Sequence, residues 1–289
     1  ATEQVLAAMT SPERFEAFES LTRNRDVYTW ALDALTPIVQ DFERTKLQPF
    51  YDRVGQAIRA VTPRMILFLE PPVLANSGAA SALRPAQSAT GERLPNQVSA
   101  AHAYDLVTDS DAVANPSSER LEIMFGRVAK HAEDMGLPMV VGEWGGYYGS
   151  KDARHAARLA REQLEKYHLG DLYWDLESDL NTKAFFDQLC RPYPMAVAGK
   201  TLDARLDQDS HEFALTWDEA PTANAPTVVY VPRVWFAEQP RVVLTRKSDF
   251  SWREVPGSDG GWQLQLAPLS GGGRRELHLR RVDEGAPMP

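Results

Sequence analysis

Residues 137–146 read Leu-Pro-Met-Val-Val-Gly-Glu-Trp-Gly-Gly, and we interpret this stretch as the strand on which the fold depends. A short apolar run that follows a helical segment predicts a fully buried parallel strand. Glu143 then falls where the strand gives way to a loop. At the carboxyl ends of the strands of a (β/α)8 barrel, such a position is where catalytic groups gather.

The residues around Glu143 strengthen that interpretation without deciding it. Gly142, Gly145 and Gly146 would leave space for a ligand to approach the backbone, and Trp144 offers a flat apolar face. A strand-end glutamate can instead cap the next helix or be solvated, and the stretch alone leaves both alternatives open.

Three other short apolar segments flank the central one, and the residues between them have helical periodicity. Strands are predicted at Met65–Leu69, Val98–Tyr104 and Asp171–Asp175, and helices at 117–135 and 151–168. This alternation is typical of a parallel α/β sheet. The four strands end in polar or aromatic groups, which are Glu70, His102 with Tyr104, Glu143 and Trp174.

Ahead of these strands the sequence predicts helices. One covers residues 12 to about 35, and a second runs from Pro37 to Val61 with a kink or restart at Pro49. A long loop is expected over 73–96.

After Arg191-Pro192-Tyr193-Pro194 the helical periodicity disappears, and short strands separated by turn signals follow. We therefore predict two domains, an α/β domain over residues 1–192 and a small antiparallel β-sandwich over 193–289.

Composition excludes several classes of protein. The formal charge of the 289 residues is −9, which argues against a nucleic-acid partner. Cys190 is the only cysteine, so no internal disulfide can form, and the six histidines show no metal-ligand spacing. No 18-residue apolar run exists that could span a membrane. The chain begins with Ala1 without a signal peptide, and we expect a processed, truncated or incompletely recovered sequence.

Several motifs together resemble glycoside hydrolase family 5, and specifically its endoglycoceramidase-like branch. The resemblance covers most of residues 45 to 280. The segments that resemble barrel strands five to eight and the helix before them are 50–61, 68–71, 102–104, 141–145 and 173–174, and those that resemble the C-terminal domain are 191–194 and 230–232.

The resemblance implies a role for each candidate residue. Glu143 matches the nucleophile, while His102 and Tyr104 match the pair that binds the sugar and steadies the nucleophile. Trp174 matches the platform under the sugar, and Glu70 and Trp144 are expected to contact substrate. From the residues alone, Glu70 could equally anchor a loop, His102 could be structural and Trp174 could belong to the core.

The sequence departs from the family pattern in one respect. The family carries its acid/base in an Asn-Glu-Pro run after strand four, and this chain contains no such run. We therefore expect the C-terminal half of a (β/α)8 barrel, strands five to eight, followed by the sandwich. Alone, it would be inactive because the acid/base is missing.

The expected function is that of a retaining β-glycosidase that hydrolyses glycolipids, such as glycosylceramides, or other β-glucosides. The alternative is a non-catalytic, carbohydrate-binding remnant of such an enzyme. Neither a cofactor nor a metal is expected, and the resemblance suggests a secreted or cell-surface location.

Overall fold

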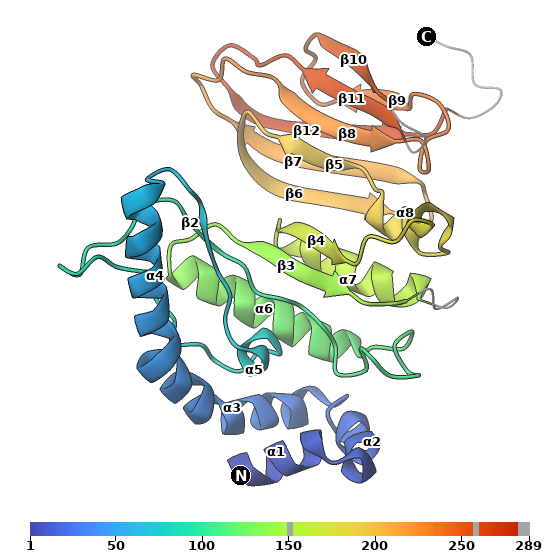
Figure 1. Ribbon diagram of the computed structural model, residues 1–289. Coiled ribbons are helices and arrows are strands. Elements are labelled where there is room, and N and C mark those ends of the chain that lie inside the picture. The colour runs from blue at the N-terminus through green and yellow to red at the C-terminus, as the bar shows by residue number, and fades with distance from the viewer. Residues whose placement is uncertain (149–152, 257–259, 283–289) are drawn as a thin grey trace. The chain divides into compact units, whose positions relative to one another are not determined.

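The structure is a computed structural model that describes residues 1–148, 153–256 and 260–282 (Figure 1). The chain divides into two compact units, which we call unit 1 (Ala1–Ser178) and unit 2 (Asp179–Pro289). Unit 1 alternates helices with parallel strands, and unit 2 is built mainly of antiparallel strands. The expected order of an α/β region followed by an antiparallel region is confirmed. The units divide after Ser178, whereas the domain boundary was predicted after Pro192.

Unit 1 is organised on four short strands, β1 (Leu67–Leu69), β2 (Gln97–Ser99), β3 (Val140–Gly145) and β4 (Gly170–Trp174). The pairs β1–β2 and β3–β4 are both parallel. Single parallel bridges, Ser99 to Met139 and Ala103 to Trp144, join β2 and its continuation to β3. The strands therefore lie side by side in chain order. The strand expected over 98–104 is shorter because the chain leaves regular pairing between Ser99 and Ala103.

Four helices and one π-helical turn precede β1, namely α1 (Thr2–Thr10), α2 (Pro12–Leu21), α3 (Arg25–Phe42), η1 (Glu43–Leu47) and α4 (Gln48–Val61). The helix predicted over 12–35 is interrupted because Asn24 caps α3. Its side-chain oxygen accepts hydrogen bonds from the amides of Asp26 (3.0 Å) and Val27 (3.2 Å). The restart predicted at Pro49 is confirmed, since this proline lies in the first turn of α4.

The connection between β1 and β2 contains one short helix, α5 (Val73–Asn76), and a loop held by buried side chains. Glu43 has no exposed surface, and its carboxylate accepts hydrogen bonds from the Ser81 hydroxyl (2.7 Å) and from the amide of Ala82. The long loop expected over 73–96 is therefore attached to η1 by a buried carboxylate.

Two amphipathic helices complete unit 1, α6 (Ser118–Asp134) and α7 (Arg154–Lys166). The apolar face of α6 is buried at Leu121, Met124, Phe125 and Val128. Residues 151 and 152 of the second predicted helix, 151–168, lie outside the described residues.

Unit 2 begins with two short helices, η2 (Leu180–Thr182) and α8 (Phe186–Leu189). Its strands are β5 (Tyr193–Ala196), β6 (Gly199–Asp207), β7 (Glu212–Glu219), β8 (Thr227–Pro232), β9 (Arg241–Leu244), β10 (Phe250–Val255), β11 (Gly261–Leu266) and β12 (Gly273–Arg280). They form two antiparallel sheets of four strands, in the orders β10-β11-β8-β5 and β6-β7-β12-β9. Trp217 and Leu277 from one sheet and Val229 and Leu264 from the other belong to one fully buried cluster, so the sheets share a core.

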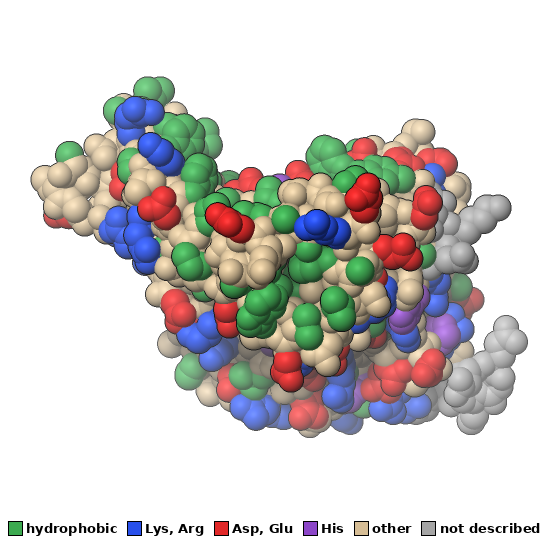
Figure 2. Space-filling view, turned by 90° about the horizontal axis from the view of Figure 1, so that it is seen from below, with side chains coloured by type: hydrophobic (Ala, Val, Ile, Leu, Met, Phe, Trp, Pro, Cys, Tyr) green, Lys and Arg blue, Asp and Glu red, His purple; other side chains and the backbone are tan. Residues whose placement is uncertain are grey.

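Apolar side chains also reach the surface of unit 1. Phe68 on β1 is 56% exposed and Leu172 on β4 is 60% exposed, although parallel strands are as a rule buried on both faces. These two strands are therefore exposed on one face at Phe68 and Leu172, and closure as half of a barrel stays a prediction. On α3 and α4, Trp30, Phe42 and Phe50 are also exposed, and Figure 2 shows such hydrophobic side chains lying among charged ones. Within the described ranges, none of the helices has the length and apolar character needed to cross a membrane.

Candidate active site

Glu143 lies near the carboxyl end of β3, and its side chain is about one-third exposed. The hydroxyl of Tyr104 donates a hydrogen bond to Oε2 of this carboxylate at 2.9 Å. Burial raises the pKa of the Tyr104 phenol above its usual range, and the hydrogen bond and charge of Glu143 raise it further. The phenol therefore keeps its proton at neutral pH and remains a donor to Glu143.

The ring of His102 lies between two carboxylates. Its Nδ1 atom is 3.3 Å from Oε2 of Glu143 and 3.4 Å from Oε1 of Glu70. Four of the six candidate residues, Glu70, His102, Tyr104 and Glu143, thus meet at one place, as expected for groups at the ends of neighbouring parallel strands. Their roles in binding and catalysis stay predictions.

The glycines around Glu143 make room for side chains of the protein itself. A Cβ atom on Gly142 would lie 3.1 Å from Cδ2 and 3.2 Å from Nε2 of His102. Gly145 has φ +104°, and a Cβ there would lie 2.2 Å from Cε2 of Tyr173. From the sequence, these glycines are expected to let a ligand approach the backbone. At Gly142 and Gly145 the space is instead occupied by the side chains of His102 and Tyr173.

Trp144 differs from its expected role. Its side chain has no exposed surface, and its Nε1 donates to Oδ1 of Asp171 at 2.9 Å. The indole packs edge-on against the ring of Tyr173, with centroids 5.5 Å apart. The fully buried ring of Trp144 offers no open face for stacking on a sugar, and its contacts with Asp171 and Tyr173 join β3 to β4.

Trp174 remains available for contact with a ligand. It ends β4 with 45% of its surface exposed, and its peptide bond to Asp175 is cis. Its carbonyl accepts a hydrogen bond from the amide of Gly146 at 2.8 Å, which ties the loop after β3 to the end of β4.

Tyr51 is a site-supporting residue that the sequence interpretation missed. Its hydroxyl donates to the carbonyl of Glu70 at 2.7 Å and accepts from the amide of Glu70 at 3.0 Å. Both backbone polar groups of Glu70 are therefore held by one side chain from α4. Apolar periodicity along a helix does not distinguish a tyrosine whose hydroxyl reaches a strand end, so no local signal indicates this role of Tyr51.

The arrangement suits nucleophilic chemistry by a carboxylate. The Tyr104 hydroxyl and the His102 imidazole both lie against Oε2 of Glu143, so together they can fix the direction of this carboxylate. Among the described residues, no group of three or more His, Cys, Asp or Glu side chains is arranged to hold a metal ion.

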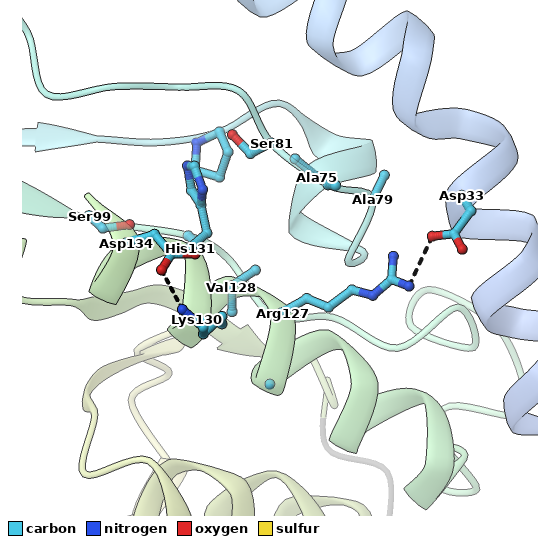
Figure 3. A pocket seen from close by; sticks show the side chains of 14 residues that line it. Asp33, Ala75, Ala79, Ser81, Ser99, Arg127, Val128, Lys130, His131 and Asp134 are labelled. Carbon is cyan, nitrogen blue, oxygen red and sulfur yellow. Dashed lines mark hydrogen bonds and ion pairs between the residues drawn. The ribbon is translucent and has the colours of Figure 1, made fainter. Parts of the chain in front are cut away.

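A separate pocket of about 560 Å³ lies in unit 1 beside α3, α5 and α6 (Figure 3). An ion pair of 3.0 Å between Arg127 and Asp33 links α6 to α3 at its edge, and Lys130 pairs with Asp134. Glu143 and the three residues grouped with it, Glu70, His102 and Tyr104, do not line this pocket. The pocket is therefore not part of the candidate active site.

Two family models match this chain. Residues 19–180 match the cellulase model of glycosyl hydrolase family 5, and residues 191–265 match the C-terminal domain of glycoside hydrolase family 5. No curated protein matches the chain.

Solved structures with a similar fold include an endo-glycoceramidase and a sterylglucosidase. Endo-glycoceramidase II from Rhodococcus sp., in a complex with a cellobiose-like imidazole, superposes with a TM-score of 0.68 at 20% identity, covering 97% of this chain and 68% of that one. Its complex with ganglioside GM3 gives 0.68 at 19% identity, with 97% and 67% covered. Sterylglucosidase 1 from Cryptococcus neoformans gives 0.59 at 14% identity, with 82% and 44% covered.

Proposed function

The chain belongs to glycoside hydrolase family 5, and we propose that Glu143 is the nucleophile of a retaining β-glycosidase that acts on glycolipids or related β-glucosides. The observation that carries this proposal is the position of Glu143 at the carboxyl end of β3, with Tyr104 at 2.9 Å and His102 at 3.3 Å. A nucleophilic carboxylate needs such groups to fix its orientation toward the anomeric carbon.

In the proposed reaction, a carboxylate oxygen of Glu143 attacks the anomeric carbon as the bond to the leaving oxygen breaks. The leaving oxygen keeps the electron pair and takes a proton from an acid, and water then hydrolyses the glycosyl–enzyme ester. Tyr104 and His102 steady the carboxylate before the attack. Trp174, half-exposed at the end of the next strand, provides the platform under the sugar.

The substrate class rests on the structural relatives. One of them is named an endo-glycoceramidase and was solved with a ganglioside, and another is named a sterylglucosidase. Each of the two names combines a sugar with a lipid, which is ceramide in one and a sterol in the other. We therefore propose a carbohydrate joined to a lipid as the substrate, with Glu70 and His102 contacting the sugar.

No residue of this sequence matches the acid/base of the family, because the sequence contains no Asn-Glu-Pro run. We therefore propose that the 289 residues alone turn over no unactivated β-glucoside. General acid catalysis contributes about 10²–10⁴-fold, so its loss would suppress hydrolysis of an alkyl glycoside. A dinitrophenyl leaving group needs no protonation and would bypass this requirement.

Covalent labelling tests the proposal directly. The chain is incubated with 2,4-dinitrophenyl 2-deoxy-2-fluoro-β-glucoside, and intact and peptide masses are recorded. We expect one fluoroglucosyl group on Glu143, none on a Glu143→Gln variant, and unchanged stoichiometry on a Glu13→Gln control at the exposed start of α2.

Two results would contradict this proposal. Sugar binding without any label would favour the alternative of a non-catalytic, carbohydrate-binding remnant. Full hydrolysis of an unactivated glucoside by the 289 residues would show that one of their own groups supplies the proton, with Glu70 the first to test.

A further inference from the structure

We propose that Asn76 is a positioning residue that holds the His102 main chain and the Glu70 carboxylate together, and so keeps a proton on His102 Nδ1 between Glu70 and Glu143. This inference rests on the proposed function, in which His102 steadies Glu143. Asn76 was not among the residues indicated by the sequence.

The side chain of Asn76 makes two contacts with the site. It is the last residue of α5 and only 8% exposed. Its Oδ1 accepts a hydrogen bond from the amide of His102 at 3.0 Å, and its Nδ2 donates to Oε1 of Glu70 at 3.3 Å. Because a backbone amide can only donate, the oxygen of Asn76 must face His102, and the NH2 group then faces Glu70.

The oxygen of Glu70 that Asn76 holds is also the one next to the imidazole. Oε1 of Glu70 lies 3.4 Å from Nδ1 of His102, and Oε2 of Glu143 lies 3.3 Å from the same nitrogen. A lone pair on Nδ1 would face two negative oxygens, whereas a proton there is attracted by both. Asn76 therefore favours the Nδ1-protonated ring by fixing Glu70 and the main chain of His102 at the same time.

The environment of His102 limits the alternatives. Gly142 leaves space for the Cδ2 and Nε2 edge of the ring, and the ring of Tyr104 lies edge-on with centroids 6.4 Å apart. Among the residues that the structure describes, two charged groups lie within 4 Å of the imidazole, Glu70 from the end of β1 and Glu143 from β3. A change at Asn76 should therefore reach the His102 ring by two routes, through the Glu70 carboxylate and through the main chain of His102.

The first experiment measures the tautomer of His102 in the whole chain and needs no turnover. Ring-¹⁵N spectra of the wild type, with the His102 signals assigned by their loss in His102→Gln, should show the Nδ1-protonated form of the neutral ring. Asn76→Ala should shift the population toward the Nε2-protonated form. Asn115→Ala, the same change at an exposed loop position, should leave it unaltered.

The second experiment measures how fast the fluoroglucoside labels Glu143. Asn76→Ala should slow labelling by about 10- to 100-fold, because the reacting groups lose their alignment. Asn76→Asp has almost the same shape but sets a second carboxylate against Glu70. Its labelling rate should be low at neutral pH and recover as the pH falls and the new carboxyl gains a proton that it can donate. Asn76→Ala should show no such recovery.

The two readouts separate failure of this inference from failure of the proposed function. If the wild type takes no label at all, the proposed function fails, while the spectra still test the role of Asn76. If Asn76→Ala folds and His102 keeps the wild-type tautomer, the positioning role is overturned. It is also overturned if Asn76→Asp labels Glu143 with the pH profile of the wild type.

Discussion

The hydroxyl of Tyr104 lies 2.9 Å from Oε2 of Glu143, although 39 residues separate them in the chain. The contact joins the end of β3 to the chain that continues from β2. The Tyr104 phenol is thus a neutral donor to one oxygen of the proposed nucleophile, and its raised pKa keeps the phenol protonated.

Removing this donor should slow the attack by Glu143. A hydrogen bond to a charged group contributes about 1.5–3 kcal/mol, so Tyr104→Phe should reduce the rate of fluoroglucoside labelling by about 10- to 100-fold. The control is Tyr167→Phe, which removes a hydroxyl next to Gly126, outside the four residues that meet at Glu143. Equal rates for both variants would contradict the role given to Tyr104.

Adding one methyl group at Gly142 should displace His102. The new Cβ would lie 3.1 Å from the ring and 3.2 Å from the carbonyl oxygen of Ala100, which is closer than nine in ten real Cβ contacts, so these neighbours must shift. We expect Gly142→Ala to lower the labelling rate and to alter the ring-¹⁵N signals of His102. Gly170→Ala is the matched control, because its Cβ would meet only Val140, at 3.6 Å. Unchanged signals in both variants would show that the ring does not depend on this space.

The buried ion pair between Arg120 and Asp105 should contribute strongly to the stability of unit 1. Arg120 is 1% exposed and bonds Asp105 through Nη2 (2.6 Å) and Nε (2.9 Å). Arg120→Ala leaves a buried carboxylate without this partner, so the free energy of unfolding should fall by about 3–5 kcal/mol. Lys130→Ala breaks an exposed pair with Asp134, which solvent screens, and should lower the free energy of unfolding far less. Urea denaturation of both variants measures the difference, and similar losses would contradict the prediction.

Glu43 should make stability depend on pH in a defined direction. Burial raises the pKa of its carboxyl, although hydrogen bonds from Ser81 and Ala82 act the other way. Below the ordinary carboxyl pKa both the folded and the unfolded chain hold the proton. As the pH rises, the unfolded chain releases it first, so stability is lost through the folded pKa.

Glu43→Gln removes that titration. The free energy of unfolding of the variant, relative to the wild type, should therefore increase from about pH 4 to about pH 7 in urea titrations. The exposed change Glu13→Gln should give no such trend. A difference between Glu43→Gln and wild type that stays constant with pH, or that shrinks as the pH rises, would show that burial does not govern this carboxyl.

Local patterns in the sequence predicted the strand-end position of Glu143, the alternation of helices with parallel strands, and the change to antiparallel strands near residue 193. These features depend on the period of apolar residues and on turn signals within a few positions, so no distant contact is needed to infer them. The same patterns placed Glu70, His102 and Tyr104 at the ends of strands. Parallel strands bring such ends to one edge of a sheet, which explains why the three residues lie together with Glu143.

The tertiary structure alone decided what local sequence could not. Trp144 was expected to face a ligand, yet it is buried against Asp171 and Tyr173. The contact of Asn76 with His102 joins residues 26 positions apart, which no local pattern indicates. Whether a polar side chain reaches a carboxylate, a backbone amide or solvent depends on distances set by packing between remote segments. Sequence periodicity carries no information on those distances, and they determine which of the strand-end groups can act on Glu143.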